Sequence, residues 1–351
     1  VFLCIISMYL QKTSIFVLVS AVTEFQYDDI KGLGALFNHI DTDEILATTE
    51  MVFLPTLVST GSMRGDEFDK NQKNFYIIPG MEGHHERFRK LCERLKLPAV
   101  VFQPGFDNKE ETVQDIARRF AEVLLKKNKI KKTFYLLGYE SGVMIALETA
   151  AILEENGLTG VVYCLGGMPG DLQKEIQEHL KEYKTEEELC DAVVSHMSFL
   201  IVGDDSHRQD INLAPSSTST ISEKIDIGVR IILGRVSHSA QYVRALIESA
   251  LGRIAQMQKY TFSLQPLRSK LVVLRATKRS TTSLQEFSMQ PVVEYDLQNP
   301  FSHCAADLRC ATIINEYLSP DILEDFLTKN LCETYLLNAD SFMSTNYNDV
   351  E

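Results

Sequence analysis

The chain has 351 residues, of which 45% are hydrophobic and 24% are charged, which is the composition of a globular protein with ample material for a core. Its formal net charge of −13 argues against nucleic acid as a partner, because phosphate binding needs clustered Lys and Arg. The seven cysteines form no C-x-x-C pair and the eight histidines form no H-E-x-x-H motif, so neither a disulfide framework nor a metal site is predicted. Reduced thiols favour a cytoplasmic location.

Residues 1–55 are predicted to form a separate N-terminal segment. Its apolar start is interrupted by polar residues from Gln11 to Ser14, whereas a membrane-spanning helix needs about 20 nearly continuous apolar residues. The segment also lacks the basic start and cleavage site of a signal peptide, so no membrane span is predicted. The polar residues 56–74 are interpreted as a linker to a main domain at 75–338, and residues 339–351 as a polar tail.

The main domain begins with apolar runs that alternate with amphipathic stretches. Strands are predicted for "NFYIIPG", "AVVFQPG", "FYLLGYE" and "GVVYCLGG", and helices for "ERFRKLCERL" and "EETVQDIARRFAEVLLKK". The strands lack period-two alternation, which is typical of a parallel sheet covered on both faces.

The pattern changes after the fourth of these strands. Residues 171–260 predict helices only, with a Ser/Thr-rich break, and two late strands, "KLVVLRAT" and "VVEYDL", come before a last helix, "DLRCATIINEYL". A helical block inserted late into such a sheet is interpreted as a lid.

The stretch "FYLLGYESGVMIALETA", residues 134–150, carries the strongest functional signal. A strand runs into a Gly-x-x-x-Gly turn, Gly138 to Gly142, and then into a helix, which is the layout of the G-x-S-x-G nucleophile elbow. The central position is Glu140, and Ser141 comes one residue late. Two interpretations stay open: an elbow whose nucleophile is replaced, or a tight turn in which the glycines merely allow close packing.

Taken in order, these motifs cover residues 73–330 and resemble the thioesterase domain of animal-type (insect-like) fatty acid synthase, a member of the α/β-hydrolase superfamily. The similarity is carried by "FYIIPGMEG", "ETVQDIARRFAEVLLKK", "LLGYESGVMIALETA", "VVYCLGGMPG" and "KLVVLRAT". It implies an α/β-hydrolase fold, a mostly parallel sheet with helices on both faces, and a helical lid at about 171–260.

The resemblance also implies hydrolysis of acyl thioesters on acyl carrier protein, in fatty acid biosynthesis. The partner would be the carrier or its phosphopantetheine-linked acyl chain, and a homodimer would be expected within a synthase. No cofactor and no metal are implied. The segment "YDDIKGLGALFNHID" is faintly similar to the last helix of a carrier domain, but no D-S-L motif accepts a phosphopantetheine arm, so residues 1–55 are interpreted as a carrier remnant.

Carried over residue by residue, the catalytic triad is not kept. The nucleophile position holds Glu140, and the acid position holds Gly166, because "GGMP" stands where D-G-S-P is expected. The gapless match for the histidine falls on Phe301, with His303 two residues later. The oxyanion hole would use the backbone N–H groups of Ser141 and Met81, which side-chain changes leave in place.

Three functional hypotheses follow. The first is a thioesterase-like domain that no longer hydrolyses acyl thioesters and serves as an acyl-binding or structural module. The second is an active thioesterase in which Ser141 is a shifted nucleophile and His303 its base. The third is an assembly part of a synthase whose product is released elsewhere. Removing a triad member typically lowers the rate by about 10⁴ to 10⁶, so the sequence favours the first hypothesis.

Overall fold

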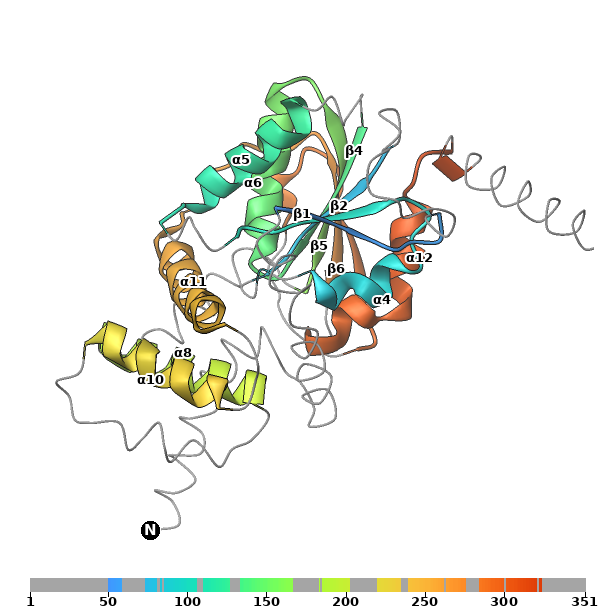
Figure 1. Cartoon of the computed structure of the whole chain (residues 1–351). Helices are drawn as coiled ribbons and strands as arrows, with labels where there is room; N and C mark the ends of the chain where they lie inside the picture. The colour runs from blue at the N-terminus through green and yellow to red at the C-terminus, as the bar shows by residue number, and fades with distance from the viewer. Residues whose placement is uncertain are drawn as a thin grey trace, which may run out of the picture.

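The computed structural model describes residues 50–58, 73–80, 83, 85–105, 110–126, 133–166, 183, 185–202, 220–234, 239–261, 263–275, 284–299, 301–320 and 322–323. These residues form a seven-stranded sheet with the strand order β1-β3-β2-β4-β5-β6-β7 (Figure 1). The strands are β1 (Met51–Leu54), β2 (Phe75–Ile78), β3 (Ala99–Phe102), β4 (Thr133–Tyr139), β5 (Thr159–Leu165), β6 (Lys270–Arg275) and β7 (Val293–Asp296). Only the β1–β3 pair is antiparallel, so the predicted mostly parallel sheet is confirmed.

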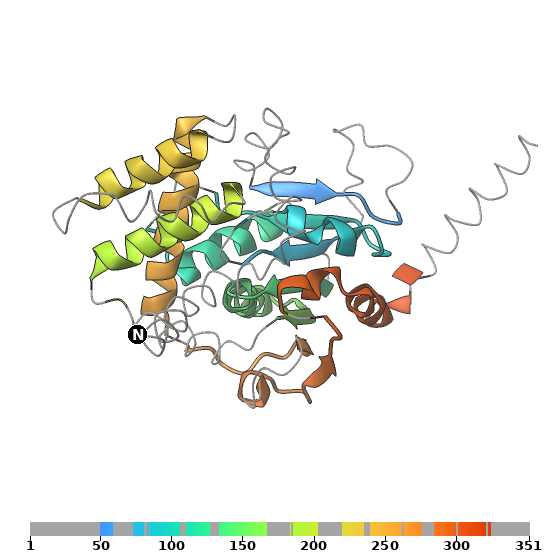
Figure 2. The same cartoon turned by 90° about the horizontal axis from the view of Figure 1, so that it is seen from below.

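Helices cover both faces of this sheet (Figures 1 and 2). On one face lie α5 (Val113–Lys126) and α6 (Gly142–Glu155), and on the other lie α4 (Arg89–Cys92) and α12 (Leu308–Glu316). Short 3₁₀ turns are η1 (Glu86–Phe88), η3 (Leu284–Phe287) and η4 (Phe301–Ala306). The helix predicted over "ERFRKLCERL" is shorter than expected, because only η1 and a single turn of α4 form there.

The burial of the strands explains why their sequences do not alternate between apolar and polar residues. In β4, Phe134 and Leu136 pack into the layer under α5 and α6, whereas Tyr135, Leu137 and Tyr139 pack into the opposite layer. Successive side chains point to opposite faces, and both faces are buried, so every position must be apolar. The two edge strands do alternate in exposure, since each has one less protected face.

Strand β1 lies within the range that the sequence assigns to the N-terminal segment. It pairs with β3 in the sheet of the main domain, with Met51 opposite Phe102 and Leu54 opposite Ala99. The main domain therefore begins before the predicted linker. The segment before Glu50 and the predicted tail at 339–351 lie outside the described residues.

The lid prediction agrees with what the structure describes between residues 171 and 260, where every described element is a helix. These helices are α8 (Glu186–Val202), α10 (Ile221–Leu233) and α11 (Ala240–Lys259). They share a small apolar core of their own, and Gly228 of α10 leaves room for Val194 of α8. Ile254 and Met257 of α11 also pack into the core under α5 and α6, so α11 joins the lid to the sheet domain. Among the described helices, none has the length and apolarity needed to cross a membrane.

A buried carboxylate attaches the C-terminal end of α6 to the start of β6. Glu154 is 8% exposed, and it accepts hydrogen bonds from the backbone N–H groups of Ser269 at 2.6 Å and Arg268 at 2.8 Å. Charge-assisted hydrogen bonds of this kind are stronger than neutral ones. The contact fixes α6 along the sheet, and α6 begins at the Gly-x-x-x-Gly turn.

We therefore predict that Glu154→Ala lowers the free energy of unfolding by about 2 kcal/mol, because it leaves two N–H groups without their acceptor. The neighbouring Glu155 is exposed, so Glu155→Ala is the matched control and should change stability by no more than about 0.5 kcal/mol. Urea unfolding measures both variants. Equal effects of the two substitutions would contradict an anchoring role for Glu154.

Candidate active site

The strand order has a topological switch point at the carboxyl ends of the parallel strands. The chain leaves β2 toward β3 on one side and leaves β4 toward β5 on the other, so the connections diverge between β2 and β4. In open α/β sheets, ligands bind outside the carboxyl ends of the strands at such a switch point. Gly80, Gln103, Glu140 and Gly166 all lie shortly after the carboxyl ends of parallel strands, at this same edge.

The Gly-x-x-x-Gly turn has the geometry of a strained elbow with Glu140 at its tip. Glu140 has φ of 51°, and it is the only non-glycine residue with positive φ in the described part of the chain. A Cβ at Gly138 would lie 2.5 Å from Val143 Cα, and a Cβ at Gly142 would lie 2.3 Å from the Pro79 carbonyl oxygen. Close packing therefore requires both glycines. Packing alone does not require the left-handed tip, which is the feature of a nucleophile elbow.

The side chain of Glu140 is buried against the loop that follows β2. Glu140 is 3% exposed, and its Oε2 lies 2.1 Å from the position that a Cβ on Gly80 would take. The carboxylate thus packs directly on the Gly80 backbone. Gly80 also begins a tight turn, in which its carbonyl accepts the Gly83 N–H at 3.0 Å. This loop is the one to which the resemblance assigns an oxyanion donor, but Met81 itself lies outside the described residues.

Ser141, the predicted shifted nucleophile, has an ordinary backbone. It is the N-cap of α6 with φ −59° and ψ −26°, is 2% exposed, and makes no capping hydrogen bond with its side chain. The strained tip is at Glu140, one residue earlier. The hydroxyl of Ser141 therefore does not occupy the elbow tip, although its backbone stands at the predicted oxyanion position.

The other two triad positions follow β5 and β7. Gly166 has φ of 84°, and its N–H donates to the Leu274 carbonyl at 3.0 Å. Phe301 and His303 both belong to η4, which packs against η1 and α4. Their side chains lie outside the described part of the structure, so the role of His303 as a base stays a prediction.

Asp307 secures the loop that leads from β7 to η4. Its carboxylate accepts the N–H groups of Gln298 at 2.9 Å, Asn299 at 3.0 Å and Arg309 at 2.9 Å. Asp307 is 4% exposed, and its three hydrogen bonds are partly buried. The loop that carries the histidine position is therefore held in place at its far end.

A buried His–Gln pair at this edge was not predicted as a site. His85 is fully buried, and its Nδ1 lies 2.8 Å from Gln103 Oε1, which also accepts the His85 backbone N–H at 3.2 Å. An amide oxygen can only accept hydrogen bonds, so Nδ1 of His85 carries a proton. The sequence signal for this pair was Gln103, a polar residue placed directly after an apolar strand.

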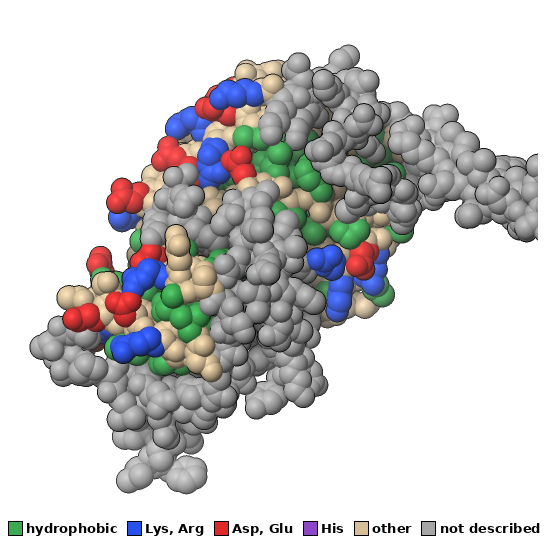
Figure 3. Space-filling view, viewed as in Figure 1, with side chains coloured by type: hydrophobic (Ala, Val, Ile, Leu, Met, Phe, Trp, Pro, Cys, Tyr) green, Lys and Arg blue, Asp and Glu red, His purple; other side chains and the backbone are tan. Residues whose placement is uncertain are grey.

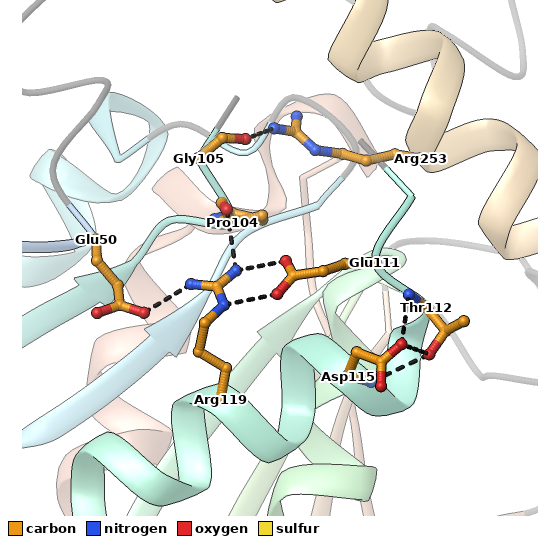
Figure 4. A network of polar contacts seen from close by, with 8 residues as sticks. All are labelled: Glu50, Pro104, Gly105, Glu111, Thr112, Asp115, Arg119 and Arg253. Carbon is orange, nitrogen blue, oxygen red and sulfur yellow. Dashed lines mark hydrogen bonds and ion pairs between the residues drawn. The ribbon is translucent and has the colours of Figure 1, made fainter. Parts of the chain in front are cut away.

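Two arginines hold the loop after β3, as Figure 4 shows. Arg119 of α5 forms a two-pronged ion pair with Glu111 at 2.9 and 2.7 Å, and it also donates to Glu50 at 2.6 Å and to the Pro104 carbonyl at 3.0 Å. Burial lowers the pKa of Arg119, but the hydrogen bonds that it donates to Glu111 and Glu50, and their negative charges, outweigh this effect and the pKa is raised overall.

Arg253 approaches the same loop from the lid. It lies on α11 and donates to the Gly105 carbonyl at 3.1 Å (Figure 4). A Cβ on Gly83 would lie 2.5 Å from its Nη1, so the guanidinium also touches the turn after β2. The lid helix α11 therefore contacts the loops after β2 and β3.

On the face of the molecule seen in Figure 3, which has the same view as Figure 1, acidic and basic side chains of the described residues are interspersed. Within the described residues, no cluster of three His, Cys, Asp or Glu side chains is arranged to hold a metal ion. The buried polar side chains described at this edge are the carboxylate of Glu140, the imidazole of His85, the amide of Gln103 and the hydroxyl of Ser141.

We predict that Arg119→Lys lowers the free energy of unfolding by about 1–3 kcal/mol, because an ammonium cannot reproduce the two-pronged pair with Glu111. Arg118 is the matched control: its side chain is 60% exposed, and Arg118→Lys should have little effect. Thermal and urea unfolding report both. Indistinguishable stabilities for the two variants would show that the network adds nothing to the fold.

The packing of Glu140 on Gly80 predicts strong coupling between these positions. Gly80→Ala should destabilise the native chain by about 1–3 kcal/mol, because the new methyl group meets the carboxylate. In a Glu140→Gly background the carboxylate is gone, and Gly80→Ala should then lower stability by less than about 0.5 kcal/mol. Urea unfolding of the four proteins completes the double-mutant cycle. Additive effects would disprove the contact.

Comparison with known proteins shows the fold. No family model matches the chain, and no curated protein matches it in sequence. A four-domain nonribosomal peptide synthetase bound to AMP and glycine is similar in structure, with a TM-score of 0.56 and 13% identity over 76% of this chain and 20% of that chain. The present chain thus spans about a fifth of the length of that synthetase.

The Vlm2 thioesterase domain is similar over nearly its whole length. One structure of this domain contains genetically encoded 2,3-diaminopropionic acid and is bound with a dodecadepsipeptide. Its comparison with this chain gives a TM-score of 0.51 and 12% identity, and the alignment covers 77% of this chain and 98% of that chain. A second crystal form of the same complex gives a TM-score of 0.50 and 11% identity, over 77% of this chain and 100% of that chain. At such identities the similarity shows fold alone. The chain has the α/β-hydrolase fold of thioesterase domains, as predicted.

Proposed function

We propose that this chain is a thioesterase-like domain of a fatty acid synthase type of polypeptide, which binds a carrier-linked acyl chain without hydrolysing its thioester. The observation that carries the proposal is Glu140 at the tip of the elbow, with its carboxylate buried on Gly80. A serine hydrolase needs a hydroxyl at this tip and a base that deprotonates it. Attack by a carboxylate would instead give an acyl anhydride, which is a different intermediate.

The elements around the elbow support a role in binding. The lid helices have their own core, and Arg253 connects them to the loops beside the elbow. The Vlm2 thioesterase domain, which shares the fold, is bound with a dodecadepsipeptide. The partner that we propose here is an acyl carrier protein or its phosphopantetheine-linked acyl group, within a homodimeric synthase.

The structure favours this proposal over an active serine hydrolase. Ser141 stands one residue past the strained tip and has ordinary helical backbone angles, so its hydroxyl is not held where the elbow presents a nucleophile. The position that would supply the triad acid is Gly166, which has no side chain. The hydrolysis test must therefore exclude a thioesterase activity that uses Ser141 as nucleophile and His303 as base.

We predict that the native chain releases no thiol from a long-chain acyl-CoA above the background rate. Glu140→Ser alone should add little activity, since Gly166 supplies no carboxylate to orient an imidazole. Adding Gly166→Asp and Phe301→His should raise the rate well beyond the single change. Gly166 has φ of 84°, and Asp tolerates left-handed backbone better than most residues, so the triple variant is the appropriate one to build.

Thiol release is followed with a colorimetric thiol reagent, and a fluorophosphonate probe tests for an activated serine. Probe labelling of the native chain that disappears in Ser141→Ala would contradict the proposal and establish the shifted nucleophile. Robust turnover by Glu140→Ser alone would show that a base and an acid already stand elsewhere at the sheet edge, so that the positions assigned to them here are wrong.

A further inference from the structure

The Glu140 carboxylate packs on Gly80, although the backbone angles of position 80 do not require a glycine. The described glycines with positive φ are Gly83, Gly105, Gly157 and Gly166, and Gly80 is not among them. Glycine is therefore not required at position 80 by its backbone angles. A Cβ at position 80 would instead lie 2.1 Å from Oε2 of Glu140, so the carboxylate would have to shift to make room for it.

The elbow holds this carboxylate in place rather than leaving it in solvent. The positive φ of Glu140 is strained for a non-glycine residue, yet the side chain is 3% exposed. The strain and the burial both persist only because the surrounding structure fixes them. Glu140 is thus a built-in occupant of the space beside the loop after β2.

This space is where the acyl carbonyl would be received. The resemblance assigns the oxyanion donors to the loop after β2 and to Ser141; Glu140 directly precedes Ser141, and its carboxylate packs on Gly80 at the start of that loop. A carboxylate is close in shape and charge to the oxyanion that such donors stabilise. The same place cannot hold both the Glu140 carboxylate and an acyl carbonyl.

We infer that Glu140 is the resident ligand of its own site: its carboxylate closes the acyl-binding position beside Gly80, and an acyl thioester enters only when this side chain turns away. The inference rests on the proposed function, because it concerns the regulation of that binding site. It makes the native chain a weak acyl binder whose site opens by a movement of one side chain.

The test is the affinity for hexadecyl-CoA, a thioether that cannot be hydrolysed, measured by isothermal titration calorimetry because the chain contains no tryptophan. Glu140→Gly empties the position and suits the positive φ, and we expect it to bind at least about tenfold more tightly than the native chain. Glu140→Gln keeps the shape without the charge, and it should bind like the native chain.

Glu140→Ser also removes the carboxylate, and it replaces Glu140→Gly in the test if that variant does not fold. Thermal unfolding checks that both variants are folded. Equal affinity of the native chain and the emptied variants would overturn the inference while leaving acyl binding established. A gain in Glu140→Gln as large as in Glu140→Gly would also overturn it, since charge and not occupancy would then exclude the ligand. No binding by any of the variants would instead refute the proposed function, and with it this inference.

Discussion

The close approach of α6 to the sheet is the constraint on which the site depends. Neither Gly138 nor Gly142 has room for a Cβ, because β4 meets the first turn of α6 and α6 meets the end of β2. Between these two contacts the chain turns from strand to helix, and Glu140 at the turn has left-handed backbone at the carboxyl edge of the sheet. Whatever side chain stands at position 140 is therefore presented at the switch point of the fold.

Several contacts fix the elements and loops of this part of the fold. Glu154 fixes the far end of α6 on β6, Arg119 and Arg253 hold the loop after β3, and Asp307 holds the loop before η4. These are supports of the kind that position a reacting group. At the other end of α6, the elbow holds a carboxylate packed on Gly80, so the α/β-hydrolase fold presents Glu140 at the tip of its elbow.

The lid belongs to the same arrangement. Its three helices pack on one another, and α11 extends into the core beneath α5 and α6. Arg253 touches the turns after both β2 and β3, so the lid is connected to the loops at the carboxyl edge of the sheet. Glu140 packs on Gly80 in the first of these turns, so the lid contact and the Glu140 contact lie in the same loop.

The sequence by itself predicted the succession of strands and helices along the chain from β2 onward, the helical stretch before β6 and the place of the elbow, because these follow from local periodicity and from two glycines in a fixed spacing. Only the tertiary structure revealed β1 in the sheet, the pairing of His85 with Gln103, and Glu140 resting on Gly80. Each of these is a contact between residues that are distant in sequence. No local pattern specifies such contacts, since the packing of the whole sheet edge brings the partners together.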